Sequence, residues 1–165
     1  CPWAHRTLLV RAVLGLEDAI TISIAKPRRT DQGWVFDAAG AYADTLLGVQ
    51  AVHEIYTRQS PPYTGRITVP VLWDKKTAQI VSNESADIVR ILALAFDPAR
   101  RLVPKDHEAE LDRWNALIHP HINNGVYRAG FARTQEAYAR APTSLPRWTR
   151  SRRISTPKPP WSARA

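Results

Sequence analysis

The order of apolar patterns along the chain is the feature that most constrains its fold. Apolar side chains spaced three and four residues apart predict helices, whereas alternation with polar residues predicts strands. The chain shows, in order, a helix pattern at 2–15, a strand at 19–25, a helix at 46–59, strands at 69–73 and 79–81, a helix at 83–96 and helices from 107 to 139. Predicted strands therefore occur only in the first half of the chain, and the remainder is helical.

This order lacks one strand of a mixed sheet. A strand placed ahead of Cys1 completes a βαβ-α-ββα unit, which is the α/β thioredoxin-like arrangement. We therefore expect such a domain over residues 1–100, with its first strand missing, and the start of an all-α domain over residues 105–140. Within the first domain, residues 26–46 follow neither period and predict a long ordered loop of the kind that serves a site.

The positive charge of the chain is concentrated in its last segment. The 165 residues carry a formal net charge of +8, but residues 141–165 hold five arginines, one lysine and no acidic residue, which leaves a nearly neutral body. Proline, serine and arginine dominate this segment without an apolar period and predict a disordered basic tail. It is either a polyanion-binding arm or a frameshift product. The neutral body predicts no specific nucleic-acid binding, and no apolar run is long enough to span a membrane.

The single cysteine, Cys1, limits the redox chemistry of the chain. One cysteine cannot form an internal disulfide, which favours a reducing, cytoplasmic location. It directly precedes Pro2 and a predicted helix, and thiols at helix N-termini have a lowered pKa because unpaired N–H groups stabilise the thiolate. Such a thiolate attacks disulfide or thioether sulfur, and the resolving thiol must come from another molecule, such as glutathione. The alternative is an inert cysteine that caps the helix.

Four stretches of the sequence match the motifs of one family. They are Cys1-Pro2-Trp3-Ala4-His5-Arg6, Gly33-Trp34-Val35-Phe36, Asn83-Glu84-Ser85-Ala86-Asp87-Ile88, and the stretch from Ile122 to Ala132. In these motifs the chain resembles the glutathionyl-hydroquinone reductases, also called Xi-class glutathione transferases, over residues 1 to about 140. Members of that family are longer and the chain contains no methionine, so the resemblance implies that the chain is a fragment. The resemblance also implies that the complete parent is a homodimer.

The resemblance implies a two-step exchange that uses glutathione as co-substrate and no metal. The thiolate of Cys1 would take the glutathionyl group from a glutathionyl-hydroquinone and release the hydroquinone. Free glutathione would then reduce the mixed disulfide. A separate metal reading of His119 and His121 has little support, because these two histidines lack a further ligand at metal-binding spacing.

The resemblance also implies where glutathione binds. Val69 and Pro70 would form a cis X-Pro turn at the start of a strand, with outward backbone groups that pair with the cysteinyl part of glutathione. An ordinary turn proline is the alternative. Glu84 and Ser85 open a predicted helix and suit the ammonium and carboxylate of the γ-glutamyl group. Plain helix capping is the alternative for this pair, and both can hold together.

Two aromatic residues complete the implied site. Trp34 lies in the predicted loop and either shields the thiol site, stacks on a ligand or packs in the core. Tyr127 would donate a hydrogen bond to a phenolic oxygen of the aromatic substrate, unless it is an ordinary exposed helical tyrosine. His5 and Arg6 follow Cys1 closely and would add positive potential there, although Arg6 is equally compatible with a position in solvent.

Two other functions remain open from the sequence. An omega-like thioltransferase or dehydroascorbate reductase shares the cysteine chemistry and differs in its aromatic pocket. A non-catalytic fragment with a polyanion-binding tail would retain part of the fold without activity, because a sheet without its first strand exposes unpaired backbone groups. We expect the isolated chain to be unstable and poorly active, and its complete parent to be a reductase.

Overall fold

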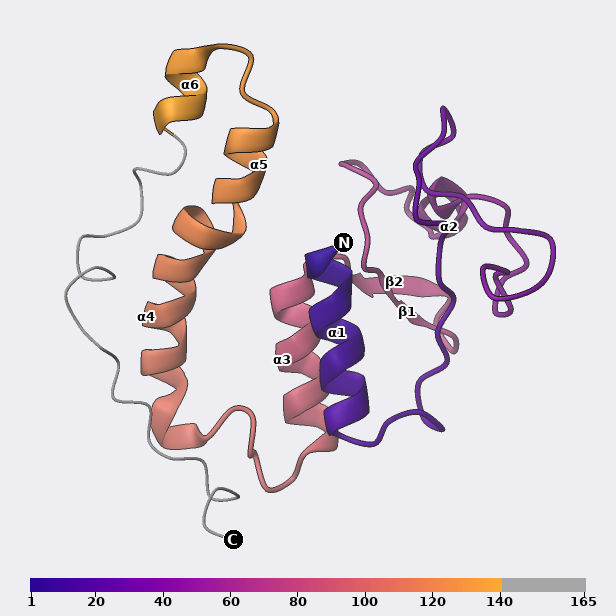
Figure 1. Cartoon of the computed structure of the whole chain (residues 1–165). Coiled ribbons are helices and arrows are strands. Elements are labelled where there is room, and N and C mark those ends of the chain that lie inside the picture. Colours follow the sequence, from indigo (N-terminus) through magenta and orange to yellow (C-terminus); the bar gives the residue numbers. More distant parts are fainter. Residues whose placement is uncertain (141–165) are drawn as a thin grey trace, which may run out of the picture. The chain divides into compact units, whose positions relative to one another are not determined.

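The regular elements of the described part of the chain are short helices and one hairpin, joined by long irregular segments. The computed structural model describes residues 1–140 and separates two compact units, Cys1–Lys105 and a unit that begins at Asp106. The elements are α1 (Pro2–Val13), α2 (Val52–Arg58), β1 (Leu72–Asp74), β2 (Gln79–Ser82), α3 (Ser85–Phe96), the 3-10 turn η1 (Lys105–His107), α4 (Glu108–Ile118), the π-helical turn η2 (His119–Asn123), α5 (Gly125–Gly130) and α6 (Gln135–Arg140) (Figure 1).

Helix α1 begins directly after Cys1, as the sequence predicts. Pro2 is tolerated in the first turn because its missing N–H would have no partner inside the helix. At the other end, Leu14 donates its backbone N–H to the carbonyl of Val10, and the chain turns at Gly15 with φ +64°. A residue with a side chain rarely adopts this left-handed conformation, so the glycine provides a low-strain end to the helix.

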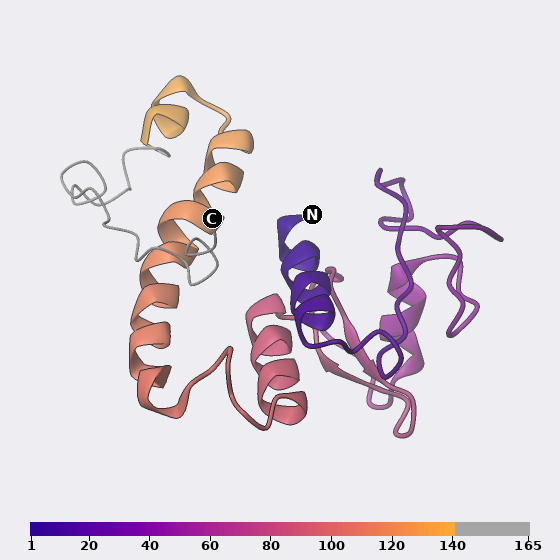
Figure 2. The same cartoon turned by 60° about the horizontal axis from the view of Figure 1, so that its bottom comes forward.

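Helices α1 and α3 lie side by side in the first unit, with their N-terminal ends at the same end of the pair (Figure 1, Figure 2). A small core of Leu16, Ile88 and Leu92 is buried there, each of the three side chains being at most 6% exposed. The parallel packing of two helices places two positive dipole ends close together.

The hairpin separates these two helices from α2 (Figure 2). Strands β1 and β2 are antiparallel, with Trp73 opposite Ile80 and Asp74 opposite Gln79. Leu72 contacts the α1–α3 core, whereas its neighbour Trp73 packs on the α2 side. This alternation is the ordinary consequence of strand geometry, in which successive side chains point to opposite faces. The second core consists of Val49, Val52, Ile55 and Tyr56.

The strand predicted at 19–25 is absent from the structure, and this expectation was wrong. Ile20, Ile22 and Ile24 alternate as a strand would, but the segment belongs to no ladder with another described strand. Its neighbour Lys26 donates its N–H to the carbonyl of Val35, which gives only an isolated contact. Alternation sets the faces of a strand, but a strand exists only where a neighbouring segment pairs with its backbone.

The helix predicted at 46–59 is shorter than expected and begins at Val52. The preceding residues are held by Asp44, whose carboxylate accepts the backbone N–H groups of Leu46, Leu47 and Val49 at 3.1 Å each. Ser23 donates its hydroxyl to the same carboxylate at 2.6 Å. These side-chain bonds compete with helix formation and order the end of the long loop.

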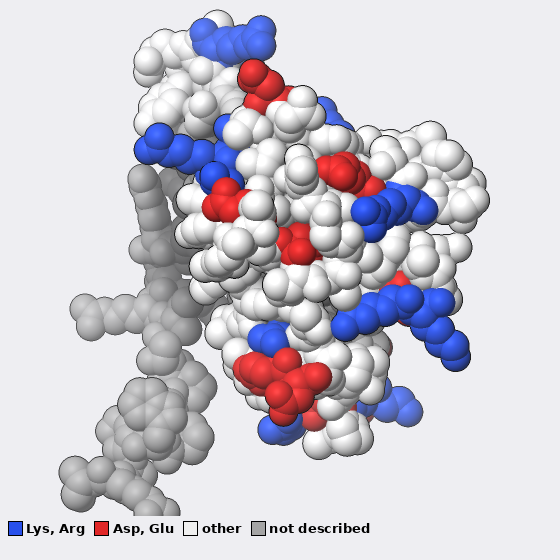
Figure 3. Space-filling view, turned by 90° about the vertical axis from the view of Figure 1, so that its right-hand side faces the viewer, with Lys and Arg blue, Asp and Glu red and all other residues white. Residues whose placement is uncertain are grey.

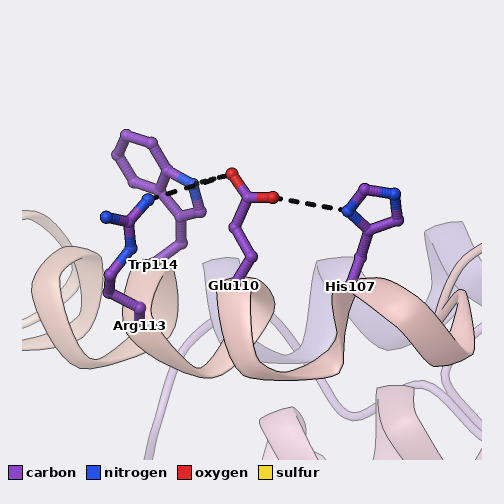
Figure 4. Close-up of polar contacts among 4 residues, drawn as sticks. All are labelled: His107, Glu110, Arg113 and Trp114. Carbon is purple, nitrogen blue, oxygen red and sulfur yellow. Dashed lines mark hydrogen bonds and ion pairs between the residues drawn. The ribbon is translucent and has the colours of Figure 1, made fainter.

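The second unit consists of short helices. Pro120 interrupts the helical pattern, and the interruption takes the form of the π-helical turn η2 between α4 and α5. On α4, the Glu110 carboxylate accepts a hydrogen bond from the ring N–H of Trp114 and contacts the Nδ1 atom of His107 (Figure 4). The Nη2 atom of Arg113 lies 3.9 Å from Oε1 of the same carboxylate. The bonds from Trp114 and His107 lower the pKa of Glu110. All four side chains are exposed, so this group is a solvated helix face.

On the face drawn in Figure 3, acidic and basic side chains are interspersed over the described residues. The predicted disordered tail, residues 141–165, lies outside the described part of the chain. None of the helices within residues 1–140 is both long and apolar enough to cross a membrane.

Candidate functional site

Cys1 is an exposed free thiol at the start of α1. It is the N-cap residue, and its carbonyl accepts the backbone N–H of His5 at 3.0 Å. The thiol makes no capping bond within the described residues, and the first turn of α1 contains no acidic residue. The sulfur is therefore accessible at the positive end of a helix, the environment that favours a thiolate.

Arg6, one helical turn further on, connects the start of α1 to the start of α3. Its Nε and Nη2 atoms donate to the Oγ atom of Ser85 at 3.0 and 2.7 Å. The guanidinium also lies over the ring of Trp3, 5.0 Å from its centroid. Burial lowers the pKa of Arg6, and the nearby carboxylate of Glu84 opposes this effect. Arg6 is therefore not simply solvated, which was one of the two sequence expectations.

Glu84 and Ser85 stand where the sequence analysis expected them, at the start of α3. Glu84 is the exposed N-cap residue, and Ser85 is the first helical residue and only 4% exposed. Asn83 belongs to a residue type that favours the N-cap position, but it is not the cap of α3. Its Nδ2 atom donates to the hydroxyls of Tyr63 and Thr68, both at 3.1 Å, because the side chain faces the loop before β1.

Val69 and Pro70 form a half-buried turn shortly before β1. The peptide bond between them is cis, as expected from the sequence. Thr68, the preceding residue, is held by Tyr56, whose hydroxyl donates to the Thr68 carbonyl at 2.7 Å and accepts the Thr68 N–H at 3.3 Å. Asn83 also donates to the side chain of Thr68, so the turn and the start of α3 belong to one hydrogen-bonded network.

Trp34 is half-buried and packs against the core beneath α2. Its carbonyl accepts the N–H of Val52 at 2.8 Å, and the guanidinium of Arg29 lies 5.7 Å from its ring centroid. These contacts fix the middle of the long loop against the first residue of α2. A packing role is therefore visible, and a role in shielding a ligand stays a prediction.

Tyr127 lies on α5, in the second unit. Its ring is stacked on that of Phe131, with centroids 6.3 Å apart and planes inclined by 17°. The Phe131 side chain is 79% exposed. Tyr127 and Cys1 belong to different units of the chain. The predicted contact of Tyr127 with a substrate therefore stays a prediction.

Within residues 1–140, no group of three histidine, cysteine or acidic side chains is arranged to hold a metal ion. His119 and His121 both lie on the π-helical turn, and the Nδ1 atom of His119 is 3.4 Å from the side-chain nitrogen of Asn124. This arrangement offers two imidazoles on one short turn, fewer protein ligands than zinc sites use.

The contact between Arg6 and Ser85 is not predicted by any of the sequence motifs. The spacing of Trp3 and Arg6 on a helix signals their stacking, because residues three apart share a face. The partner of Arg6 on α3 is 79 positions away, and no local pattern indicates it.

Comparison with known proteins identifies the class of this arrangement. Residues 1–95 match the glutathione S-transferase, N-terminal domain. The chain therefore belongs to the glutathione S-transferase family. The expected fold class, a thioredoxin-like domain followed by helices of the C-terminal domain, is confirmed, with a sheet of two strands in the described residues.

Within this family the chain is similar to the glutathionyl-hydroquinone reductases, as expected from its motifs. It is 47% identical over 147 residues to the glutathionyl-hydroquinone reductase YqjG of Escherichia coli K12, covering 86% of this chain and 45% of the relative. It is 44% identical over 146 residues to the glutathionyl-hydroquinone reductase PcpF of Sphingobium chlorophenolicum, covering 86% of this chain and 47% of the relative. The chain thus spans about half the length of these relatives.

Solved structures give the same relationship. The glutathione-bound structure of YqjG superposes with a TM-score of 0.80 at 44% identity, covering 88% of this chain and 49% of that one. Glutathione transferase Xi 1 from Trametes versicolor has a TM-score of 0.76 at 43% identity, with 88% and 53% covered. The similarity to Xi-class enzymes therefore extends through most of the described residues.

Proposed function

We propose that this chain is the glutathione-binding part of an oxidoreductase that reduces glutathionyl-hydroquinones to hydroquinones. The observation that carries the proposal is the accessible thiol of Cys1 at the start of α1, beside the start of α3 with Glu84 and Ser85. Support also comes from the similarity to glutathionyl-hydroquinone reductases and to a glutathione-bound structure.

Glutathione is assigned to residues 1–100, because the polar groups that suit it are all there. The γ-glutamyl carboxylate would accept hydrogen bonds from Ser85 and the first N–H groups of α3, and its ammonium would contact Glu84. The cysteinyl part would pair with the backbone beside Val69 and Pro70, which the Tyr56–Thr68 contact holds in place. Trp34 would border this site from the loop.

The aromatic half of the substrate is assigned to the helical domain, residues 105–140. Tyr127 would donate its hydroxyl to a phenolic oxygen of the hydroquinone. The exposed aromatic ring of Phe131, stacked on Tyr127, offers apolar surface for such a ligand. The complete protein is proposed to be a cytoplasmic homodimer.

The first chemical step forms a mixed disulfide. The thiolate of Cys1 attacks the thioether sulfur of the glutathionyl-hydroquinone, an S–S bond forms and the bond from sulfur to the ring carbon breaks. The ring carbon takes the electron pair and a proton and leaves as hydroquinone. The Cys1 sulfur and the glutathionyl sulfur are thereby each oxidised to the disulfide level, and the ring carbon is reduced by the same two electrons.

The second step regenerates the enzyme. The thiolate of a second glutathione attacks the glutathionyl sulfur of the mixed disulfide, so that oxidised glutathione forms and the Cys1 thiolate leaves. Because Cys1 is the only cysteine of the chain, an external thiol is required for this step. No metal is needed in either step.

The test is capture of the intermediate on the complete parent protein. The protein is incubated with glutathionyl-hydroquinone alone, and intact-mass spectrometry should find one glutathionyl adduct on Cys1 that free glutathione removes. The Cys1→Ser variant should show no adduct. Release of hydroquinone without any adduct on Cys1 would overturn the mechanism. Efficient turnover of dehydroascorbate, without turnover of glutathionyl-hydroquinone, would instead assign the chain to the omega-like class.

A further inference from the structure

The contact between Arg6 and Ser85 restricts the hydrogen bonds that Ser85 can make. A serine hydroxyl has two acceptor positions and one donor hydrogen. The Nε and Nη2 atoms of Arg6 both donate to Ser85 Oγ, at 3.0 and 2.7 Å, and so use both acceptor positions. The Ser85 hydroxyl donates no hydrogen bond to any of residues 1–140. Toward a ligand, the Ser85 hydroxyl can therefore act only as a hydrogen-bond donor.

The direction of these hydrogen bonds cannot be reversed, because the partner of Ser85 is an arginine. A guanidinium has only donors and stays protonated, so it cannot accept the hydroxyl hydrogen of Ser85 in return. The Arg6 guanidinium lies over the ring of Trp3, with its Cζ atom 5.0 Å from the ring centroid, and it interacts electrostatically with the carboxylate of Glu84. Arg6, on α1, therefore fixes the Ser85 hydroxyl as a donor before any ligand binds.

Ser85 occupies the position where a donor is useful to an anion. It is the first residue of the twelve-residue helix α3, whose first N–H groups have no partner within the helix. An anion at this end meets the N–H groups and, beside them, an O–H hydrogen that is polarised by two bonds from a cation. These donors suit a carboxylate better than a neutral or cationic group.

We propose that Arg6 is a positioning residue, which fixes the hydroxyl of Ser85 as a donor to the γ-glutamyl carboxylate of glutathione. The proposal rests on the proposed function, because it concerns the same glutathione site. Arg6 acts through Ser85 and touches no reacting atom. It makes the affinity for the carboxylate depend on a residue of α1, the helix that begins with Cys1.

A competing role for Arg6 is purely structural. An arginine that only joins α1 to α3 would contribute to the free energy of unfolding and would affect every ligand of the site equally. A positioning role instead weakens binding selectively, for ligands that carry the carboxylate. The two roles are therefore separated by comparing ligands on one folded variant.

The experiment measures glutathione binding to the full chain by titration calorimetry. Arg6→Lys keeps the positive charge but removes the planar fork, and it should weaken glutathione about tenfold. An analogue that lacks the carboxylate of the γ-glutamyl group should bind both proteins within about twofold of each other. Arg11→Lys is the matched control, because Arg11 lies on the same helix and donates to the carbonyls of Glu17 and Ile20. It should leave both affinities unchanged.

A double-mutant cycle gives an independent measurement. In a Ser85→Ala background, Arg6→Lys should weaken glutathione by less than about twofold, because the hydroxyl through which Arg6 acts is gone. Equal affinities of wild type and Arg6→Lys for glutathione would overturn the proposal, as would a parallel loss for both ligands or full additivity in the cycle. If wild type itself does not bind glutathione, the proposed function fails, and this inference fails with it.

Discussion

The hydroxyl of Tyr56 holds both backbone polar atoms of Thr68. It donates to the carbonyl oxygen at 2.7 Å and accepts from the N–H at 3.3 Å, while the tyrosine itself is only 2% exposed. This single side chain fixes the residue that precedes the Val69–Pro70 turn. The backbone proposed to pair with glutathione is thus anchored on the core beneath α2.

Tyr56→Phe should destabilise the chain by about 1–3 kcal/mol, because it leaves the backbone N–H and carbonyl of Thr68 without their partner. The free energy of unfolding, measured with urea, is the test. The control is Tyr42→Phe, at an exposed tyrosine, which should change stability by less than about 0.5 kcal/mol. Equal effects of the two substitutions would show that the Tyr56 contact does not matter for stability.

Asp44 should make the stability of the chain fall with acid. Burial alone would raise the pKa of Asp44, but the hydrogen bonds from Ser23, Val49, Leu46 and Leu47 outweigh it and lower the pKa below its usual value. A carboxyl with a depressed folded-state pKa contributes stability above its unfolded pKa of about 3.9 and loses it as the pH falls through the folded value.

The measurement is the free energy of unfolding of wild type and Asp44→Asn between neutral and acid pH. At neutral pH the variant should be less stable by about 1–2 kcal/mol, because an amide nitrogen cannot accept the backbone N–H groups. The difference should shrink below the unfolded pKa. Asp31→Asn serves as the control, because the Asp31 side chain is exposed and makes no hydrogen bond within the described residues, and it should change the free energy of unfolding by less than about 0.5 kcal/mol. A gap that stays constant with pH would argue against a role for the ionised carboxylate.

Cys1→Ser should abolish formation of the glutathionyl adduct while leaving the fold intact. The residue is exposed and its thiol makes no capping bond among the described residues, so the free energy of unfolding should change by less than about 0.5 kcal/mol. Thermal unfolding and intact-mass spectrometry on the same preparation separate chemistry from stability. A variant that still forms the adduct would move the nucleophile away from Cys1.

Leu92→Ala should weaken the packing of α3 in the core that it shares with α1. Leu92 is 3% exposed and packs with Leu16 and Ile88, and truncation of such a residue costs about 2–5 kcal/mol. Leu94→Ala is the control on the same helix, because Leu94 is 46% exposed and should cost far less. Urea unfolding of both variants is decisive, and similar losses would contradict the assignment of this core.

Local signals determined much of the secondary structure. Pro2 and Gly15 bracket α1, and Pro120 interrupts the helices of the second unit, because these residues restrict or release the backbone at their own position. The apolar spacing over residues 83–96 likewise predicted the helix α3, on which Ile88 and Leu92 are buried. Such signals act within one or two turns and can be read without knowing the rest of the chain.

The motifs also identified the family and the residues proposed for the site. The motifs did not predict the hydrogen bonds that hold the site together. Asn83 has a side chain that suits a helix cap but bonds to Thr68. The helix expected from residue 46 begins at Val52 because Asp44 accepts hydrogen bonds from the intervening N–H groups. In each case a side chain finds a partner that competes with the local preference.

The sequence by itself determined that a helix starts directly after Cys1, and it determined the family. Only the tertiary structure decided that 19–25 forms no ladder and that Arg6 meets Ser85, 79 positions away. The physical reason is range. Backbone preference and capping depend on neighbours along the chain, whereas a ladder or a long-range hydrogen bond depends on which distant backbone or side chain the packed core brings within about 3 Å.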